Sequence, residues 1–266
     1  MSASAAAGPA AIRLDHVSKW FFKKGERIAA VADVSADIPA GAFIALVGPS
    51  GCGKSTLFNC IAGFTTPERG EVIYQGALVL GPNIGIGCMT QKDTLLPWRS
   101  VVANVMLPLQ LRKEPHAAAR ERAMAMLARV GLAGFAEHLP RELSGGMQKR
   151  ASLARTLVFS PETLLMDEPF GNVDVQLKLQ LQRELMALWE SERKTVVFVT
   201  HDLEEAIALS DRVIVLSRRP GRIKEIVSID LPRPRDPVAI RFESAFQAVH
   251  RHLWSLCDTA EEDAHG

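Results

Sequence analysis

The residue pattern with the clearest chemical meaning runs from Gly48 to Ser55. Its two outer glycines flank four variable residues and are followed by Lys and Ser, in the order Gly48-Pro49-Ser50-Gly51-Cys52-Gly53-Lys54-Ser55. Glycines let backbone N–H groups turn inward around phosphate oxygens. Lys54 can reach the outer phosphates of a nucleoside triphosphate, and the Ser55 hydroxyl can be a ligand of Mg²⁺. The pattern predicts a phosphate-binding loop.

The residues on both sides of this loop support that interpretation. Phe43–Val47 is an apolar run typical of a buried parallel strand, and Thr56–Ala62 can continue as a helix. Strand, glycine-rich loop and helix is the context that the motif needs, and the helix start adds the positive end of its dipole. The alternative is a glycine-rich turn that binds nothing, which both flanks disfavour.

Two carboxylates follow a later apolar run. Leu164–Met166 reads as a strand, and Asp167 and Glu168 come directly after it. Asp167 can hold Mg²⁺ through water, and Glu168 can accept a proton from a water molecule that attacks the γ-phosphate. Acidic strand ends are common, so the pair gains its meaning from the phosphate-binding loop.

A second helix start suits an anion. Ser144 can cap the helical run Gln148–Leu157, and Gly145 and Gly146 expose backbone N–H groups. The phosphate-binding loop already serves one nucleotide. A natural use of this second anion-binding helix start is therefore to face the nucleotide of another subunit. The alternative is a plain capped helix.

Two further side chains can complete such a site. His201 follows the apolar run Thr195–Val199 and can hydrogen-bond the γ-phosphate or orient the attacking water. Gln91 can supply a neutral oxygen to Mg²⁺. Taken alone, the histidine reads as structural and the glutamine as a surface residue.

In this order and spacing, the pieces closely resemble one family, the ABC ATPases. The matching segments are Gly48–Ser55, Gln91, Leu143–Gly146, Leu165–Glu168, Asp174 and His201, which look like Walker A, Q-loop, signature, Walker B, D-loop and H-loop. The resemblance covers roughly residues 12–230. It implies a head-to-tail homodimer with two ATP molecules, each between the loop of one subunit and the Ser144-Gly145-Gly146 segment of the other.

The resemblance also implies a role for each residue. Catalysis is expected from Glu168, His201 and Lys54, and Mg²⁺ binding from Ser55, Gln91 and Asp167. The expected ATP-binding residues are Phe21, Gly48, Pro49, Ser50, Gly51, Cys52, Gly53, Lys54, Ser55, Thr56, Ser144, Gly145, Gly146 and Asp174. Phe21 would stack on adenine, with Trp20 and Phe22 as neighbouring candidates and burial of Phe21 in the sheet as the alternative.

One branch of the family matches best. Thr94–Trp98 after Gln91, and Ser217–Arg222 after the last core strand, are similar to the ATPases of nitrate, sulfonate and taurine importers. In such importers the segment after the Q-loop contacts a coupling helix of the membrane permease, so the resemblance implies contacts at Leu95, Leu96 and Trp98. Packing of these residues inside the helical subdomain is the alternative.

The chain departs from the family pattern in two places. The D-loop reads Gly171-Asn172-Val173-Asp174, where relatives usually have Ala-Leu in the middle. The signature continues as Met147-Gln148-Lys149-Arg150, where Arg-Gln-Arg is commoner after the first of these residues. Neither change removes a catalytic group, although the first puts the tuning of the subunit interface in doubt.

The remaining patterns predict the elements that position these residues. Residues 12–40 alternate as in an antiparallel sheet of short strands, residues 92–160 form a helical subdomain, and buried strands recur at 163–166, 195–199 and 212–216. We therefore expect an α/β P-loop NTPase of the ABC ATPase type, with a mostly parallel core sheet, an N-terminal antiparallel β-subdomain and an inserted helical subdomain. The ATPase domain spans 12–230, after a disordered tail at 1–11.

Residues 231–266 are predicted to be a linker, a helix and an acidic tail. Asp236 can cap a helix that has Pro237 at its first position. The apolar residues there repeat at helical spacing; they are Phe242, Phe246, Val249, Leu253 and Leu256. The pattern favours a helix packed on the domain over one that binds a partner.

The charge, the cysteine content and the hydropathy of the chain limit the classes of function that it can have. The net charge of +1 offers no electrostatic case for nucleic acid, and the four cysteines form no CxxC pair. No apolar run is long enough to span a bilayer, so any membrane contact is expected to go through a partner. The resemblance to importer ATPases implies a peripheral place on the cytoplasmic face of the membrane. The favoured function is the ATP-hydrolysing subunit of an import complex with a permease and a separate solute-binding protein. The alternative is a non-transport ABC ATPase acting on nucleic acid or the ribosome.

Overall fold

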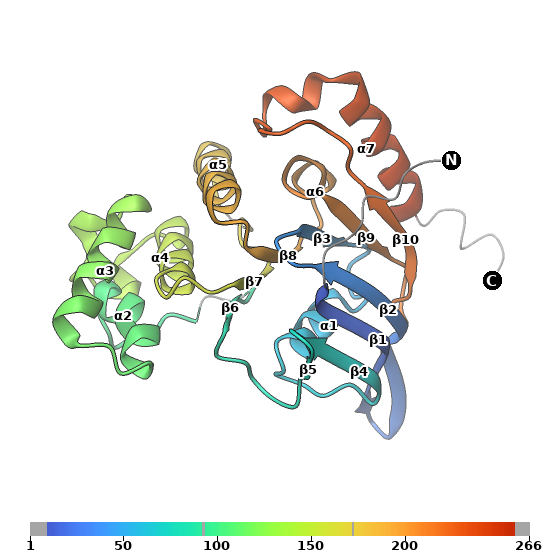
Figure 1. The fold of residues 1–266 in the computed structure, drawn as a ribbon, viewed down its shortest axis with the longest axis horizontal. Coiled ribbons are helices and arrows are strands. Elements are labelled where there is room, and N and C mark those ends of the chain that lie inside the picture. The colour runs from blue at the N-terminus through green and yellow to red at the C-terminus, as the bar shows by residue number, and fades with distance from the viewer. Residues whose placement is uncertain (1–9, 92–93, 172, 259–266) are drawn as a thin grey trace. The chain divides into compact units, whose positions relative to one another are not determined.

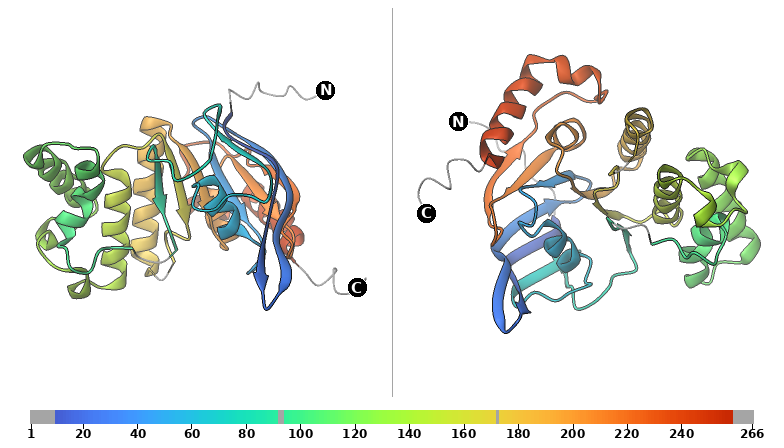
Figure 2. Two further views of the ribbon diagram at one scale, coloured as in Figure 1. Left: turned by 90° about the horizontal axis from the view of Figure 1, so that it is seen from below. Right: turned by 180° about the vertical axis from the view of Figure 1, so that it is seen from behind.

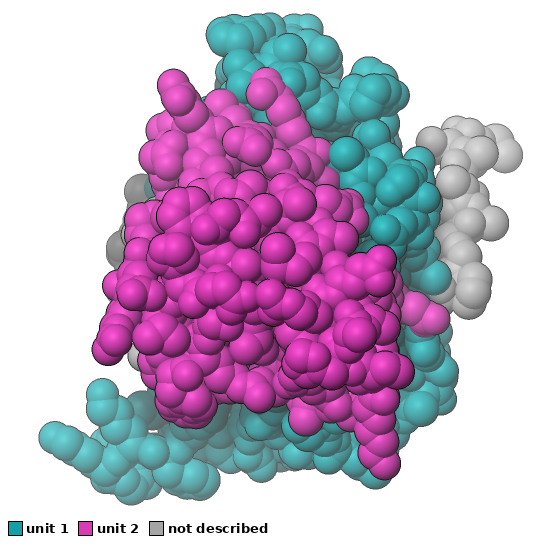
Figure 3. All heavy atoms as spheres, turned by 90° about the vertical axis from the view of Figure 1, so that its left-hand side faces the viewer, with its two compact units in different colours: residues 1–84, 186–266 teal, residues 85–185 magenta. Residues whose placement is uncertain are grey.

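The computed structural model describes residues 10–91, 94–171 and 173–258 and divides the chain into two compact units, coloured separately in Figure 3. The first unit comprises residues 1–84 and 186–266, and the second comprises residues 85–185. Residues 1–9 of the predicted tail at 1–11, residues 92–93, Asn172 and the predicted acidic tail at 259–266 lie outside the described residues. Among the residues described, no helix is long and apolar enough to cross a membrane.

The first unit holds an antiparallel sheet and a set of core strands (Figure 1). Its elements are β1 (Ala10–Lys23), β2 (Glu26–Pro39), β3 (Phe43–Val47), α1 (Lys54–Ile61), β4 (Arg69–Tyr74), β5 (Ala77–Leu78), β8 (Thr195–Val199), α6 (Leu203–Leu209), β9 (Arg212–Leu216), β10 (Ile223–Ser228), the 3₁₀ turn η3 (Ala239–Phe242) and α7 (Ser244–Cys257). The antiparallel sheet has the order β2-β1-β4-β5, and the core strands follow the order β10-β9-β3-β8. Strand β3 pairs in parallel with β8 and β9, and all five of its residues are buried.

Helix α1 lies between the two sheets of this unit. It packs against β2 and β4 of the antiparallel sheet and against β8 of the core strands, as the turned views of Figure 2 show. Because β3 leads directly into the glycine-rich loop and then into α1, the loop lies at the carboxyl end of a buried strand.

The second unit holds the helices of the insert and a parallel pair of strands. Its elements are β6 (Ile86–Met89), α2 (Val101–Leu111), α3 (His116–Arg129), the 3₁₀ turns η1 (Ala133–Phe135) and η2 (Pro140–Glu142), α4 (Gly145–Leu157), β7 (Thr163–Asp167) and α5 (Val175–Glu192), which ends in the first unit. Leu127 and Val130 are buried in its apolar core as predicted, while Met124 is only half-buried. Leu95 lies in the same core, so the prediction of a permease contact at Leu95 is wrong and internal packing holds there.

The antiparallel sheet differs from the prediction in the length of its strands. Strand β1 begins at Ala10, inside the predicted tail, and both β1 and β2 are 14 residues long, joined at Gly25. The register of their pairing shifts at several points between Ala10 and Trp20. Such shifts reverse the apolar alternation within one strand, which is why the sequence reads as several short strands.

The C-terminal helix packs on its own unit. Phe246 and Leu253 of α7 are fully buried against elements that include α6, β9 and β10. Asp236 accepts hydrogen bonds from the N–H groups of Val238 and Ala239. However, η3 begins at Ala239 with Val238 as its N-cap residue, so the predicted helix with Asp236 as its cap and Pro237 at its first position is wrong. Phe242 was expected in the buried stripe and is instead 84% exposed, because it ends the 3₁₀ turn before α7 begins.

A buried arginine holds the segment that leads to α7. The Arg235 guanidinium donates to the carbonyl oxygens of Ile207, Ser210, Ile229 and Leu231 at 2.7–3.3 Å. Burial lowers the pKa of Arg235 to about 10, so the side chain remains charged at neutral pH. The guanidinium thus satisfies carbonyl oxygens at the end of α6 and in the linker after β10.

Replacing Arg235 with Met should destabilise the first unit. The change leaves buried carbonyl oxygens without donors, so we expect the free energy of unfolding to fall by about 2–4 kcal/mol in urea titrations. The control is Arg13→Met, because Arg13 forms an exposed ion pair with Asp37 whose loss should be undetectable. Equal stability of the two variants would contradict this role for Arg235.

Candidate functional site

The phosphate-binding loop is folded around the charge of its own lysine. Lys54, the first residue of α1, is 8% exposed, and its ammonium donates to the carbonyl oxygens of Gly48 at 2.7 Å and Pro49 at 3.0 Å. The Cys52 sulfur lies 3.9 Å from the same ammonium, and burial raises the pKa of the Cys52 thiol. The loop therefore keeps one positive charge at its centre, as an anion site requires.

His201 lies at the end of the neighbouring strand β8. The Thr200 hydroxyl donates to the buried Glu205 carboxylate at 2.6 Å. Asp202 caps α6 by accepting from the N–H groups of Glu204 and Glu205. The backbone on both sides of His201 is thus held in place, while its imidazole is exposed.

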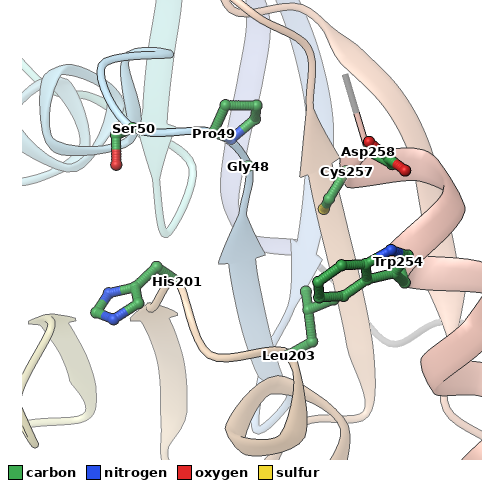
Figure 4. A pocket seen from close by; sticks show the side chains of 8 residues that line it. All are labelled: Gly48, Pro49, Ser50, His201, Leu203, Trp254, Cys257 and Asp258. Carbon is green, nitrogen blue, oxygen red and sulfur yellow. The ribbon is translucent and has the colours of Figure 1, made fainter. Parts of the chain in front are cut away.

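The loop and His201 border one cavity of about 310 Å³ in the first unit (Figure 4). Its lining residues are Gly48, Pro49, Ser50, His201, Leu203, Trp254, Cys257 and Asp258. No sequence pattern predicts that Trp254, Cys257 and Asp258 line this cavity, and Trp254 lies outside the buried stripe of α7 and is 59% exposed. The end of α7 lies near the phosphate-binding loop because of the tertiary fold, since the two segments are far apart in the sequence.

The predicted adenine-stacking residue is accessible. Phe21 lies on β1 opposite Ile28 of β2 and is 46% exposed, so its burial in the sheet is excluded. The Lys19 ammonium lies 5.6 Å from the Phe21 ring centroid. Phe22 is more exposed, and Trp20 carries the guanidinium of Arg27 over its ring.

The second unit brings the predicted carboxylates and the glutamine together. Asp167 ends β7 and is buried, whereas Glu168 is half-buried and has a left-handed backbone conformation with φ of 49°. This conformation, which is unfavourable for residues other than glycine, turns the chain sharply after the strand. The Gln91 side-chain amide donates to the Glu168 carboxylate at 3.1 Å.

The remaining predicted residues of this unit lie at helix starts. Ser144 caps α4 by accepting from the N–H group of Met147, and Gly145 and Gly146 are the first residues of that helix. Asp174 accepts from the N–H group of Leu177 at the start of α5. No acidic residue occupies the first turn of α4, so the positive end of its dipole is uncompensated there.

Each unit therefore carries one part of the predicted site. Ser55, Thr56, the rest of the glycine-rich loop and His201 belong to the first unit, while Gln91, Asp167, Glu168 and the Ser144–Gly146 segment belong to the second. In the described ranges, no group of three or more His, Cys, Asp or Glu side chains is arranged to hold a metal ion. The strand–loop–helix fold and the acidic strand end define a nucleoside triphosphatase of the P-loop class.

Comparison with known proteins identifies the family. Residues 31–171 match the family model described as "ABC transporter". An uncharacterised ABC transporter ATP-binding protein of Methanocaldococcus jannaschii is 46% identical over 87% of this chain and 86% of its own length. The taurine import ATP-binding protein TauB of Rhizobium johnstonii is 43% identical over 94% of this chain and 98% of its own.

A further relative and a solved structure agree with this assignment. The aliphatic sulfonates import ATP-binding protein SsuB of Bacillus cereus is 36% identical over 90% of this chain and 94% of its own. A dimeric ATP-binding cassette, solved in a post-hydrolysis state with ADP and Pi, superposes with a TM-score of 0.77 at 31% identity, over 83% of this chain and all of its own. The chain belongs to the ABC transporter family, and it is the ATP-binding subunit that couples ATP hydrolysis to transport. The predicted ABC fold is confirmed.

The close packing of the phosphate-binding loop gives a test of its geometry. Gly53 has φ of 108°, and a Cβ there would lie 2.6 Å from both the Ala30 carbonyl oxygen and a Val31 methyl group. Gly51 has φ of 76°, yet a Cβ would meet nothing within 4 Å. We expect Gly53→Ala to lower the free energy of unfolding by about 2–5 kcal/mol and Gly51→Ala by about 1–2 kcal/mol. If both variants lost the same free energy of unfolding in denaturant titrations, the close approach of β2 would not be the reason that position 53 requires glycine.

Proposed function

We propose that this chain is the energy-coupling subunit of an importer for a small solute such as nitrate, a sulfonate or taurine. The observation that carries the proposal is its similarity, over nearly the whole chain, to ATP-binding proteins of taurine and sulfonate import. In this function it works as a homodimer on the cytoplasmic face of the membrane. A permease and a separate solute-binding protein, which sets the selectivity, are the partners.

The first unit binds the nucleotide. The loop from Gly48 to Thr56 surrounds the phosphates with backbone N–H groups, and Phe21 stacks on adenine. Lys54 moves its ammonium from the Gly48 and Pro49 carbonyl oxygens to the outer phosphates. This exchange of partners is supported by the 2.7 Å contact, because the charge is already inside the loop.

The second unit supplies the group that activates water. Glu168 accepts the proton of the attacking water, and His201 from the first unit hydrogen-bonds the γ-phosphate. The contact between Gln91 and Glu168 supports this role, because it orients a half-buried carboxylate at a strand end. Most of the rate enhancement then comes from positioning and charge stabilisation.

Mg²⁺ suits the donors that are present. Mg²⁺ prefers oxygen ligands, and these would be the Ser55 hydroxyl, the Asp167 carboxylate and the Gln91 side-chain carbonyl. In proteins this ion is usually bound by one or two carboxylates together with the phosphates of a nucleotide. When bound, the ion neutralises charge on the phosphates.

The start of α4 acts on the nucleotide of the other subunit. Ser144, Gly145 and Gly146 offer backbone N–H groups with no acidic residue beside them, and Asp174 belongs to the same interface. ATP then holds the dimer closed because its γ-phosphate has ligands in both subunits, and hydrolysis removes that link. The dimeric state of the solved cassette supports this arrangement.

The proposed contact with the permease centres on Trp98, with Leu96 beside it. Trp98 is 74% exposed, and Leu96 is half-buried. The fully buried Asn104 fixes this segment: its amide donates to the carbonyl oxygens of Leu96, Arg99 and Ser100 and accepts from the Leu96 N–H group. A large aromatic side chain held on an ordered turn suits a binding surface.

Replacing Glu168 with Gln tests the hydrolytic mechanism. The amide cannot accept the proton, so turnover should fall by about 10²–10⁴-fold while ATP still binds and traps the dimer. Sizing at saturating ATP, with membrane partners present, reports the dimer. A monomer under these conditions would contradict the shared-site arrangement. Glu162→Gln, an exposed carboxylate just before β7, is the control and should retain turnover.

Replacing Trp98 with Ala tests coupling. Loss of an exposed aromatic anchor should weaken binding to the permease by about tenfold or more, without lowering the basal ATPase rate. Solute uptake by reconstituted complexes, measured for nitrate, sulfonates and taurine, is the assay. The control is Phe135→Ala, another exposed aromatic residue of the same unit. Unchanged uptake with Trp98→Ala would show that Trp98 is not an anchor.

A further inference from the structure

A buried cation on α4 holds the backbone of Gln91. Lys149 is 5% exposed, and its ammonium donates to the Gln91 carbonyl oxygen at 2.8 Å. Lysine is almost never buried to this extent unless it is paired, because desolvating the ammonium is unfavourable.

The same helix holds the segment beyond Gln91. Arg155, nearly two turns further along α4, donates to the Thr94 carbonyl oxygen at 2.8 Å and also to the Thr94 hydroxyl. Side chains of one helix therefore bind the chain at Gln91 and again at Thr94. Helix α4 therefore positions the backbone carbonyl of Gln91, although the Gln91 side chain is exposed.

The Gln91 side chain extends this connection to the acidic strand end. Its amide donates to the Glu168 carboxylate at 3.1 Å. Two hydrogen bonds thus run in series, from the Lys149 ammonium to the Gln91 backbone and from the Gln91 side chain to Glu168. An exposed glutamine whose backbone is fixed has fewer conformations to lose when it orients a carboxylate.

We propose that Lys149 is a positioning residue for ATP hydrolysis, which holds Gln91 so that the Gln91 amide orients Glu168. The inference rests on the roles proposed above for Gln91 and Glu168. Lys149 is not among the residues proposed above to bind the nucleotide. A change at Lys149 is therefore expected to lower the rate of hydrolysis and to leave nucleotide binding by the phosphate-binding loop intact.

The test is Lys149→Met in the full-length chain, assayed with Mg²⁺ and ATP. Loss of a charge-assisted hydrogen bond predicts a fall in kcat of about tenfold or more, with the Kd for ATP unchanged. Lys149→Gln, which keeps a shorter neutral donor, should recover part of the rate. The matched control is Arg150→Met, because the adjacent Arg150 donates to a backbone carbonyl oxygen at Val130, away from Gln91.

A double-mutant cycle separates positioning from general damage to the helix. In a Gln91→Ala background the side-chain link to Glu168 is already lost, so adding Lys149→Met should lower kcat no further. An additive loss, an unchanged kcat in the single variant, or an equal loss in Arg150→Met would each overturn the proposal. If Lys149→Met fails to fold, the same cycle is run with Lys149→Gln.

Failure of the inference can be told apart from failure of the proposed mechanism. If Glu168→Gln retains full turnover, the role of the carboxylate is wrong whatever Lys149 does. If Glu168→Gln abolishes turnover and the cycle is additive, the mechanism stands and only the positioning role of Lys149 is lost.

Discussion

At the phosphate-binding loop, three backbone segments approach one another so closely that a Cβ atom would not fit between them. These segments come from β2, from the turn after β9 and from the start of α1. A Cβ at Gly221 would lie 2.1 Å from the Cys52 carbonyl oxygen, and one at Gly53 would lie 2.6 Å from the Ala30 carbonyl oxygen. Gly221 also exchanges hydrogen bonds with the β2 backbone, donating to Ala30 and accepting from Ala32. The antiparallel sheet and the core strands are thereby joined at the loop itself. Such a loop is ordered before nucleotide arrives, so less conformational entropy is lost on binding.

The sequence predicted the buried strands well because their signal is local. The apolar runs at 43–47, 195–199 and 212–216 coincide with β3, β8 and β9. Elements whose pattern depends on pairing were predicted less well. The shifts of register in β1 break the apolar alternation, so the sequence does not predict a single strand of 14 residues. Whether Leu95 is buried and Phe242 is exposed depends on where a turn ends. A helical repeat predicts a buried face, but it does not say which residue ends the helix.

The same distinction applies to the candidate site. The glycine-rich loop, the acidic strand end and the histidine were recognisable because each is a short segment with its own chemistry. The contact of Gln91 with Glu168 joins positions 77 residues apart, and no local pattern predicts it. The approach of Trp254 and Cys257 to the loop is equally nonlocal, since it follows from the docking of α7 and from the arginine that holds the linker before it.

Helix α4 combines functions that the sequence presents separately. It begins at Gly145 and Gly146, the pair proposed above to bind an anion, and Lys149 lies one helical turn beyond Gly145. A helix transmits a displacement of its first turn along its length, because its backbone hydrogen bonds keep the rise per residue nearly constant. If nucleotide of a second subunit binds at Gly145 and Gly146, a shift of α4 therefore moves the Gln91 carbonyl as well. Under the proposed dimer, the same displacement would reach the hydrogen bond from the Gln91 side chain to Glu168.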